Sequence, residues 1–174
     1  MGAKKKTLHY SKTANKYYLY KCNYNKRTMK QIALIALCMA FRGFLSAQEP
    51  VVEQMTKADF LQKVMNYEQN PTQWVYLGNK PCIIDFYADW CRPCKIASPI
   101  LEELAKEYKG RINFYKVNTD MEKSLAGAFG IQSIPAFLYC PQNGKPQMSA
   151  GIAQSAEETK ALFKKIIEEF LLKQ

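Results

Sequence analysis

Residues 86–95 read FYADWCRPCK and join a buried strand to a helix. The residues from Cys82 to Tyr87 are mostly apolar, which predicts a strand covered on both faces of its sheet. Apolar residues then recur at helical spacing as far as Tyr108, so a helix is expected to begin at the cysteines. Cys91 and Cys94 therefore lie where a strand ends and a helix starts.

That position indicates a chemical role for the two cysteines. The unpaired N–H groups and the dipole at a helix N-terminus favour the thiolate of Cys91. Cys94 lies about one turn deeper and can close on the first thiol, as thiol–disulfide exchange requires. The alternatives are half of a zinc site and an inert structural disulfide. Zinc would need a second close pair, whereas Cys82 and Cys140 are far apart in the sequence. An inert disulfide would not need a strand-to-helix junction.

The composition excludes several other kinds of chemistry. His9, the only histidine, precedes residue 48, so residues 48–174 can build neither a Ser-His-Asp nor a Cys-His catalytic site, nor a metal site that uses histidine. Ten of the 25 Lys and Arg residues also precede residue 48, but none of the 15 acids does. Since residues 48–174 are therefore neutral, their composition indicates no basic face for nucleic acid.

The N-terminal segment has the pattern of an export signal. Met29-Lys30 is followed by an apolar run from Ile32 to Phe41 and then by Leu45-Ser46-Ala47. A basic start, about ten apolar residues and small residues before a polar segment are typical of a secretory signal peptide. We expect cleavage near Gln48 and an exported mature protein, periplasmic or otherwise extracytoplasmic. The alternatives are a membrane anchor formed by residues 32–47, which is short for a spanning helix, and no targeting role.

The expected division of the chain follows from this signal. Residues 1–47 form a basic leader, and residues 48–174 form one domain. Residues 1–28 are rich in Lys, Tyr and Asn without an apolar period, which is typical of a segment that does not fold. Because Met29 would be a conventional start of a signal peptide, we interpret it as the true start of translation. A genuine long basic leader is the alternative.

The domain reads as alternating helices and strands after a polar linker, Gln48 to Met55. Apolar spacing, caps and turn residues predict the order helix, strand, strand, helix, strand, helix, strand, strand, helix. The predicted elements are Lys57 to Tyr67, Trp74 to Leu77, Cys82 to Tyr87, Cys91 to Lys109, Ile112 to Val117, Met121 to Phe129, Ala136 to Cys140, Gln147 to Ala150 and Ala156 to Leu172. Helices between strands favour parallel pairing, and Gln142-Asn143-Gly144 predicts a closing hairpin. The expected fold class is α/β.

Three motifs together resemble the thioredoxin family: FYADWCRPCK at residues 86–95, the dipeptide Ile134-Pro135, and Gly151. The similarity runs from about residue 55 to the C-terminus, with the motifs in the family's order. It implies the thioredoxin fold, a central mixed sheet flanked by helices on both faces, and reduction of disulfides in client proteins.

The resemblance implies no metal and no cofactor beyond the redox-active disulfide Cys91–Cys94. The sequence shows no flavin or nicotinamide motif, so electrons are expected from an external donor protein or molecule. We expect a monomer that binds no nucleic acid and meets a membrane only through an uncleaved leader.

The resemblance also assigns roles to two charged residues. Asp85 matches the family's buried aspartate behind the redox pair, and burial raises the pKa of a carboxyl group. Asp85 could therefore take a proton from the resolving thiol of Cys94. Lys116 matches the lysine that partners this aspartate. The alternatives are a solvated acid at a strand end for Asp85 and an ordinary exposed strand residue for Lys116.

Five residues are assigned to a substrate-binding surface, namely Trp90, Arg92, Pro93, Ile134 and Pro135. Pro135 would leave a backbone edge open for an extended client segment. Trp90 would shield the disulfide, with plain core packing as the alternative. Arg92-Pro93 stands where thioredoxins usually have Gly-Pro, and a cation beside Cys91 favours the thiolate and a more oxidising pair. The expected protein is an exported reductase. The alternatives are an oxidase or isomerase, and a binding module without turnover.

Cys82 and Cys140 lie outside the family pattern. In the family the strands that hold them are antiparallel neighbours, with Tyr87 roughly opposite Pro135. Antiparallel pairing keeps the sum of two residue numbers constant, and both pairs have the same sum. We therefore predict that Cys82 faces Cys140, with Cα atoms about 4.5–5.5 Å apart. A disulfide there would be strained and easily reduced. Two small buried apolar residues are the alternative.

Overall fold

A computed structural model of the chain describes residues 51–173, so the predictions for the leader fall outside the described residues. Five strands form one sheet in the order β1-β3-β2-β4-β5. The strands are β1 (Glu53–Gln54), β2 (Cys82–Tyr87), β3 (Asn113–Asn118), β4 (Ala136–Cys140) and β5 (Gln147–Ala150). Strand β2 runs parallel to β3 and antiparallel to β4, so the sheet is mixed, as expected.

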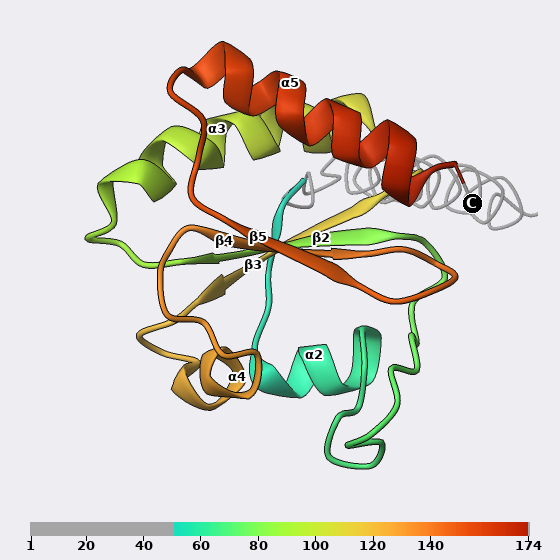
Figure 1. The fold of residues 1–174 in the computed structure, drawn as a ribbon. Helices are drawn as coiled ribbons and strands as arrows, with labels where there is room; N and C mark the ends of the chain where they lie inside the picture. The colour runs from blue at the N-terminus through green and yellow to red at the C-terminus, as the bar shows by residue number, and fades with distance from the viewer. Residues whose placement is uncertain (1–50, 174) are drawn as a thin grey trace, which may run out of the picture. The chain divides into compact units, whose positions relative to one another are not determined.

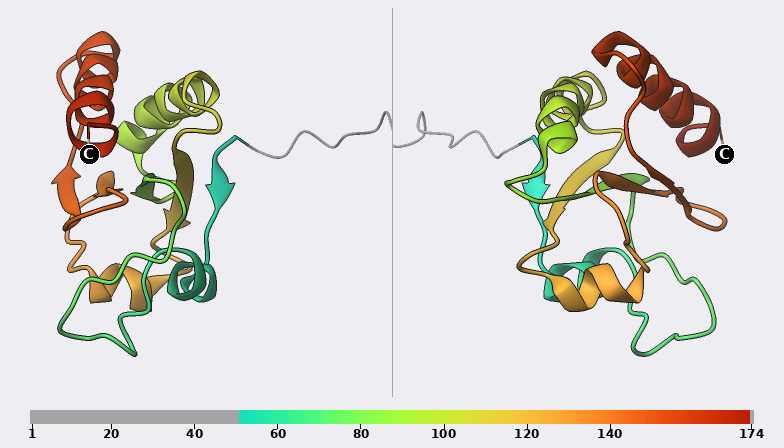
Figure 2. Two further views of the ribbon diagram at one scale, coloured as in Figure 1. Left: turned by 90° about the vertical axis from the view of Figure 1, so that its right-hand side faces the viewer. Right: turned by 60° about the vertical axis from the view of Figure 1, so that its left-hand side comes forward.

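Helices cover both faces of this sheet (Figures 1 and 2). α3 and α5 lie on one face, and α2 and α4 lie on the other. The helices are α2 (Lys57–Lys63), α3 (Arg92–Glu107), α4 (Lys123–Ala128) and α5 (Ala156–Ile166), which continues as the π-helical segment η1 (Ile167–Leu171). None of the helices within residues 51–173 is long and apolar enough to span a bilayer.

The side chains of β2 alternate between two buried clusters. Ile83 packs in the cluster beneath α3 and α5, whereas Cys82, Ile84 and Phe86 pack in the cluster with Phe60 of α2. Successive side chains of a strand point to opposite faces of a sheet, so a strand with helices on both sides is expected to be mostly apolar. This explains why β2 has the run of apolar residues seen in the sequence.

The predicted polar linker, Gln48 to Met55, is wrong where the structure describes it. Glu53 and Gln54 form strand β1, which pairs in parallel with Tyr115 and Lys116 of β3. Met55 then enters the core. A strand of two exposed residues has no apolar period, so only its pairing with β3 makes it a strand.

The predicted strand from Trp74 to Leu77 is also wrong. Its alternation is real, because Trp74 and Tyr76 pack against the core while Val75 and Leu77 are exposed. However, β2 already has β3 on one edge and β4 on the other. The segment therefore has the side-chain pattern of a strand but pairs with no strand of the sheet.

Two helices differ from the prediction at their C-terminal ends. Helix α2 starts after Thr56, which forms a capping box with Asp59, but it stops at Lys63 rather than Tyr67. The Val64 carbonyl accepts a hydrogen bond from Leu77 N–H at 2.9 Å, so a tertiary contact replaces the next helical bond. The last helix, expected from Ala156 to Leu172, continues to Leu171, but its final turn from Ile167 is the π-helical segment η1.

Candidate functional site

Cys91 and Cys94 lie at the start of α3, as predicted. Cys91 is the N-cap residue, and its Sγ accepts a hydrogen bond from the Cys94 N–H at 3.2 Å. A disulfide joins the two side chains, with an S–S distance of 2.00 Å and Cα atoms 5.3 Å apart. An N–H group of a first helical turn that points at a sulfur stabilises negative charge there. The geometry therefore favours Cys91 as the thiolate of the reduced pair.

Asp85 lies in the middle of β2 and points to the side of the sheet that α3 covers. Its neighbours Ile84 and Phe86 pack on the other side, and alternation places Asp85 opposite them. The side chain is 2% exposed, and its Oδ1 has no hydrogen-bond partner. Burial raises the pKa of Asp85 to about 7, and the charge of Lys116 opposes this only in part. A carboxyl group with such a pKa can take up and release a proton near neutral pH.

Lys116 occupies the position on β3 directly beside Asp85. The parallel register of β2 and β3 pairs the two residues, and Lys116 is half-buried. Its Nζ lies 5.9 Å from the centroid of the Tyr87 ring. No ion pair joins the Lys116 and Asp85 side chains, both of which the structure describes. Lys116 therefore influences Asp85 as a nearby charge rather than through a direct contact.

The loop before β4 brings Ile134 and Pro135 to the cysteines. Ile134 packs against the small buried cluster that contains Cys91 and Cys94. The peptide bond between Ile134 and Pro135 is cis. The Pro135 carbonyl accepts a hydrogen bond from Gly151 N–H at 2.8 Å. Gly151 has a φ of 80°, a conformation that favours glycine. The start of β4 is thus tied to the end of β5 beside the redox pair.

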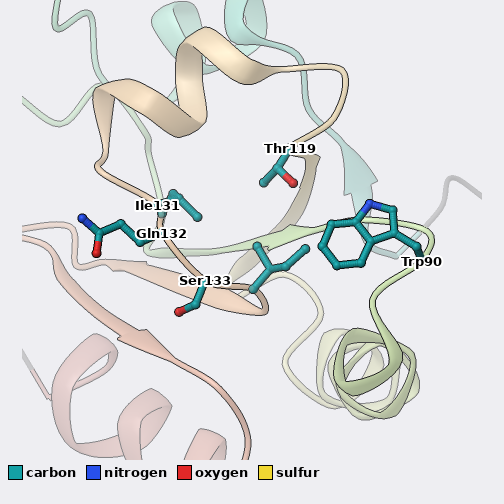
Figure 3. A pocket seen from close by; sticks show the side chains of 6 residues that line it. Trp90, Thr119, Ile131, Gln132 and Ser133 are labelled. Carbon is teal, nitrogen blue, oxygen red and sulfur yellow. The ribbon is translucent and has the colours of Figure 1, made fainter.

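A pocket of about 380 Å³ opens next to the redox pair. It is lined by Trp90, Thr119, Ile131, Gln132, Ser133 and Ile134. Figure 3 shows Trp90 on one side of the pocket, facing the residues that come from the segment before β4. The walls are partly apolar and partly polar, which suits a short extended peptide segment of another protein.

Two of the five predicted substrate-binding residues, Trp90 and Ile134, line this pocket. Arg92 and Pro93 lie on the exposed first turn of α3, outside the pocket lining. Pro135 is buried and does not line the pocket. The structure therefore brings Trp90 and Ile134 together on one surface and leaves Arg92 beside it as an exposed cation.

Several site residues were not predicted from the sequence. One of them is Asp120, whose Oδ2 accepts a hydrogen bond at 2.9 Å from the Nε1–H of Trp90. Trp90 itself is 69% exposed. Thr119 and Asp120 directly follow β3, and parallel strands β2 and β3 end at the same edge of the sheet. The expected topology could therefore have pointed to them. Gln132 and Ser133 carry no comparable signal, because only the course of the loop brings them to the pocket.

Together, a dithiol pair at a helix start, a buried carboxyl group on the strand behind it and a peptide-sized pocket beside it define the site of a thiol–disulfide oxidoreductase. Cys91 and Cys94 lie at the start of α3, and Asp85 lies on the face of the sheet that α3 covers.

Comparisons with known proteins identify the family. The thioredoxin family model matches residues 51–168. The chain is 46% identical over 116 residues to a thioredoxin of Borreliella burgdorferi, which covers 67% of this chain and 94% of that protein. It is 39% identical over 87 residues to a thioredoxin of Pyropia yezoensis, covering 50% of this chain and 71% of that protein. A crystal structure of chloroplastic thioredoxin z aligns with a TM-score of 0.51 at 22% identity, over 67% of this chain and 95% of that one.

The chain belongs to the thioredoxin family, and its described part has the thioredoxin fold. Membership implies thiol–disulfide oxidoreductase activity. Thioredoxins act through their own active-site cysteines without a cofactor, and in general they reduce disulfides in client proteins.

Proposed function

We propose that this protein is an exported protein-disulfide reductase that acts through Cys91 and Cys94. The observation that supports it best is the Cys91 sulfur at the N-cap of α3, with the Cys94 N–H directed at it and the Trp90–Ile134 pocket beside it. The export part of the proposal rests on the signal-peptide pattern of residues 29–47.

The reaction follows from these positions. The Cys91 thiolate attacks a client disulfide, which forms a mixed disulfide and releases one client thiolate. Asp85 takes the proton from Cys94, and the Cys94 thiolate then attacks Cys91 Sγ. This second exchange releases the other client thiol and leaves the Cys91–Cys94 disulfide. An external donor returns two electrons and two protons to restore the dithiol.

The redox potential of the Cys91–Cys94 couple tests the direction of this reaction. A reductase is expected to lie near the thioredoxin value of about −270 mV and to accelerate the reduction of insulin by dithiothreitol. The exposed cation of Arg92 beside Cys91 favours the second candidate, an exported oxidase or isomerase. A potential near the value of about −120 mV found for a strong oxidase would favour that candidate. No acceleration of insulin reduction would favour a binding module without turnover.

A further inference from the structure

Cys82 and Cys140 face each other across the sheet, as predicted, at the end of β2 remote from the redox pair. The register of β2 and β4 pairs them directly. Directly opposed residues of antiparallel strands have Cα atoms about 4.5–5.5 Å apart. Both residues are free thiols with 0% exposure, and both belong to the buried cluster that contains Phe60 of α2. The reaction proposed above makes no use of them.

The surroundings of this pair keep it unreactive while it is covered, and they build no metal site. Burial raises the pKa of Cys140 well above its usual value, and the neighbouring Cys82 raises it further, because the two thiols lie close together. Burial also raises the pKa values of Tyr76 and Tyr115. The electrostatic interaction with Cys82 is the second-largest cause of the rise for each tyrosine. Within residues 51–173 no set of three or more His, Cys, Asp or Glu side chains is placed to hold a metal ion. Two thiols with two phenols beside them form a dithiol site.

The segment of residues 66–80 joins α2 to β2 and contains no helix or strand. Tyr76 belongs to it, and its hydroxyl donates a hydrogen bond to the Lys80 carbonyl within the same segment. The bond from Leu77 N–H to the Val64 carbonyl attaches the segment to α2, and within it Asn70 N–H donates to the Asn66 carbonyl. Its aromatic side chains Tyr67, Trp74 and Tyr76 pack against the buried cluster. A segment held by few backbone hydrogen bonds opens locally at a low free energy. Its opening would uncover Cys82.

We propose that Cys82 and Cys140 form a second dithiol couple, which a small-molecule disulfide oxidises to a cross-strand disulfide when segment 66–80 opens. One cysteine thiolate attacks the small disulfide, which releases one small thiol and leaves a mixed disulfide on the protein. The other cysteine then attacks the protein sulfur and releases the second small thiol. Two electrons and two protons pass from the protein to the small molecule, whose S–S bond is replaced by the Cys82–Cys140 bond.

This second couple is reversible rather than permanent. The Cβ atoms of directly opposed strand residues lie about 4.5–5.5 Å apart, whereas a relaxed disulfide has Cβ atoms about 3.5–4.5 Å apart. The bond is therefore strained, and strained disulfides are reduced more easily than relaxed structural ones. Formation of this bond links β2 to β4. The other end of β2 leads to Cys91, and β4 begins directly after Pro135.

Peptide mapping of the full chain tests the proposal. The reduced protein is exposed to oxidised glutathione, its remaining thiols are alkylated, and the digest is analysed by mass spectrometry. We expect a peptide linked through Cys82 and Cys140, which disappears after mild reduction. The Cys91–Cys94 link in the same sample shows that the oxidant was active. Recovery of Cys82 and Cys140 as separately alkylated peptides, beside an oxidised Cys91–Cys94 pair, would overturn the proposal.

Two variants test the individual steps. In Cys140→Ala the mixed disulfide cannot be resolved, so glutathione should remain attached to Cys82. In Tyr76→Ala the cover over the pair is weakened, so the link should form several-fold faster than in the unmodified chain. Insulin reduction by both variants shows that the fold has been kept. An unchanged rate of linkage in a folded Tyr76→Ala variant would contradict opening of segment 66–80 as the route of access.

Discussion

At the scale of single residues, the fold strongly alters the ionisation of Asp85. Its pKa rises from an ordinary 3.8 to about 7 because the carboxyl group is buried. This difference corresponds to about 4 kcal/mol. The raised pKa means that the folded protein binds the proton more tightly than the unfolded chain. The contribution of Asp85 to stability is therefore most favourable below pH 4, declines as the pH rises to about 7, and stays constant above that.

The stability of Asp85→Asn should show this dependence. Asparagine stays neutral, so the variant should match the unmodified protein near pH 4 and exceed its free energy of unfolding by about 2–4 kcal/mol at pH 8. Denaturant unfolding at the two pH values measures the difference. An equal difference at both pH values would show that ionisation of Asp85 does not contribute to it.

The activity of the same variant should change in the opposite direction. Without a proton acceptor for Cys94, insulin reduction at neutral pH should slow on the order of 10²-fold. The matched control is Asp89→Asn, which removes an exposed carboxyl group close to the same cysteines. Turnover measured from pH 6 to 9 separates the two. A profile for Asp85→Asn that equals the Asp89→Asn profile would remove Asp85 from the mechanism.

The roles of the two cysteines can be assigned by trapping. Cys91 carries the hydrogen bond from the first helical turn, so it should be the attacking thiol. Cys94→Ala should therefore accumulate mixed disulfides between Cys91 and client proteins, visible on non-reducing gels and mapped by mass spectrometry. The reciprocal variant, Cys91→Ala, should trap none. Adducts through Cys94 in that variant would reverse the assignment.

Among the elements, α5 depends on one aromatic contact with the sheet. Phe163 of α5 is 1% exposed, and its ring meets Phe137 of β4 edge to face with centroids 4.8 Å apart. The ion pairs that join α3 and α5, Lys160–Glu103 and Lys164–Glu107, lie at the exposed surface. Exposed pairs contribute little to stability. The buried rings therefore hold the helix on the sheet.

Removing the buried ring should destabilise the domain strongly. Phe163→Ala should lower the free energy of unfolding by about 3–5 kcal/mol, because it leaves a cavity under α5. The adjacent Leu162 is 45% exposed, so Leu162→Ala is the matched control and should have a small effect. Chemical denaturation of both variants measures the difference. Similar losses in the two would mean that α5 docks through a wider surface than this contact.

At the scale of the whole molecule, the leader and the domain differ in charge. All net positive charge precedes residue 48, and the rest of the chain is neutral. We expect the leader to be removed on export, so that protein isolated from its native compartment begins near Gln48. N-terminal sequencing measures this directly. An intact leader on that material would favour a membrane anchor formed by residues 32–47.

The sequence by itself determined the elements and residues whose signals are local. Strands β2, β4 and β5 were predicted with the bounds that the structure shows, because each has a run of suitable residues between clear turns. The position of Cys91 and Cys94 at a helix start follows from the strand before them and the helix after them. The opposed pair Cys82 and Cys140 followed from register arithmetic once the resemblance to the thioredoxin family supplied the antiparallel pairing, since one register sets every pair along two strands.

Only the tertiary structure decided features that depend on partners distant in the chain. Glu53 and Gln54 became a strand because β3 lies beside them, and the segment from Trp74 to Leu77 did not, because no strand of the sheet pairs with it. The bond from Trp90 to Asp120 and the polar wall of the pocket arise where separate loops meet. Backbone and side-chain groups pair with whatever the fold places next to them, and this information is not contained in a local stretch of residues.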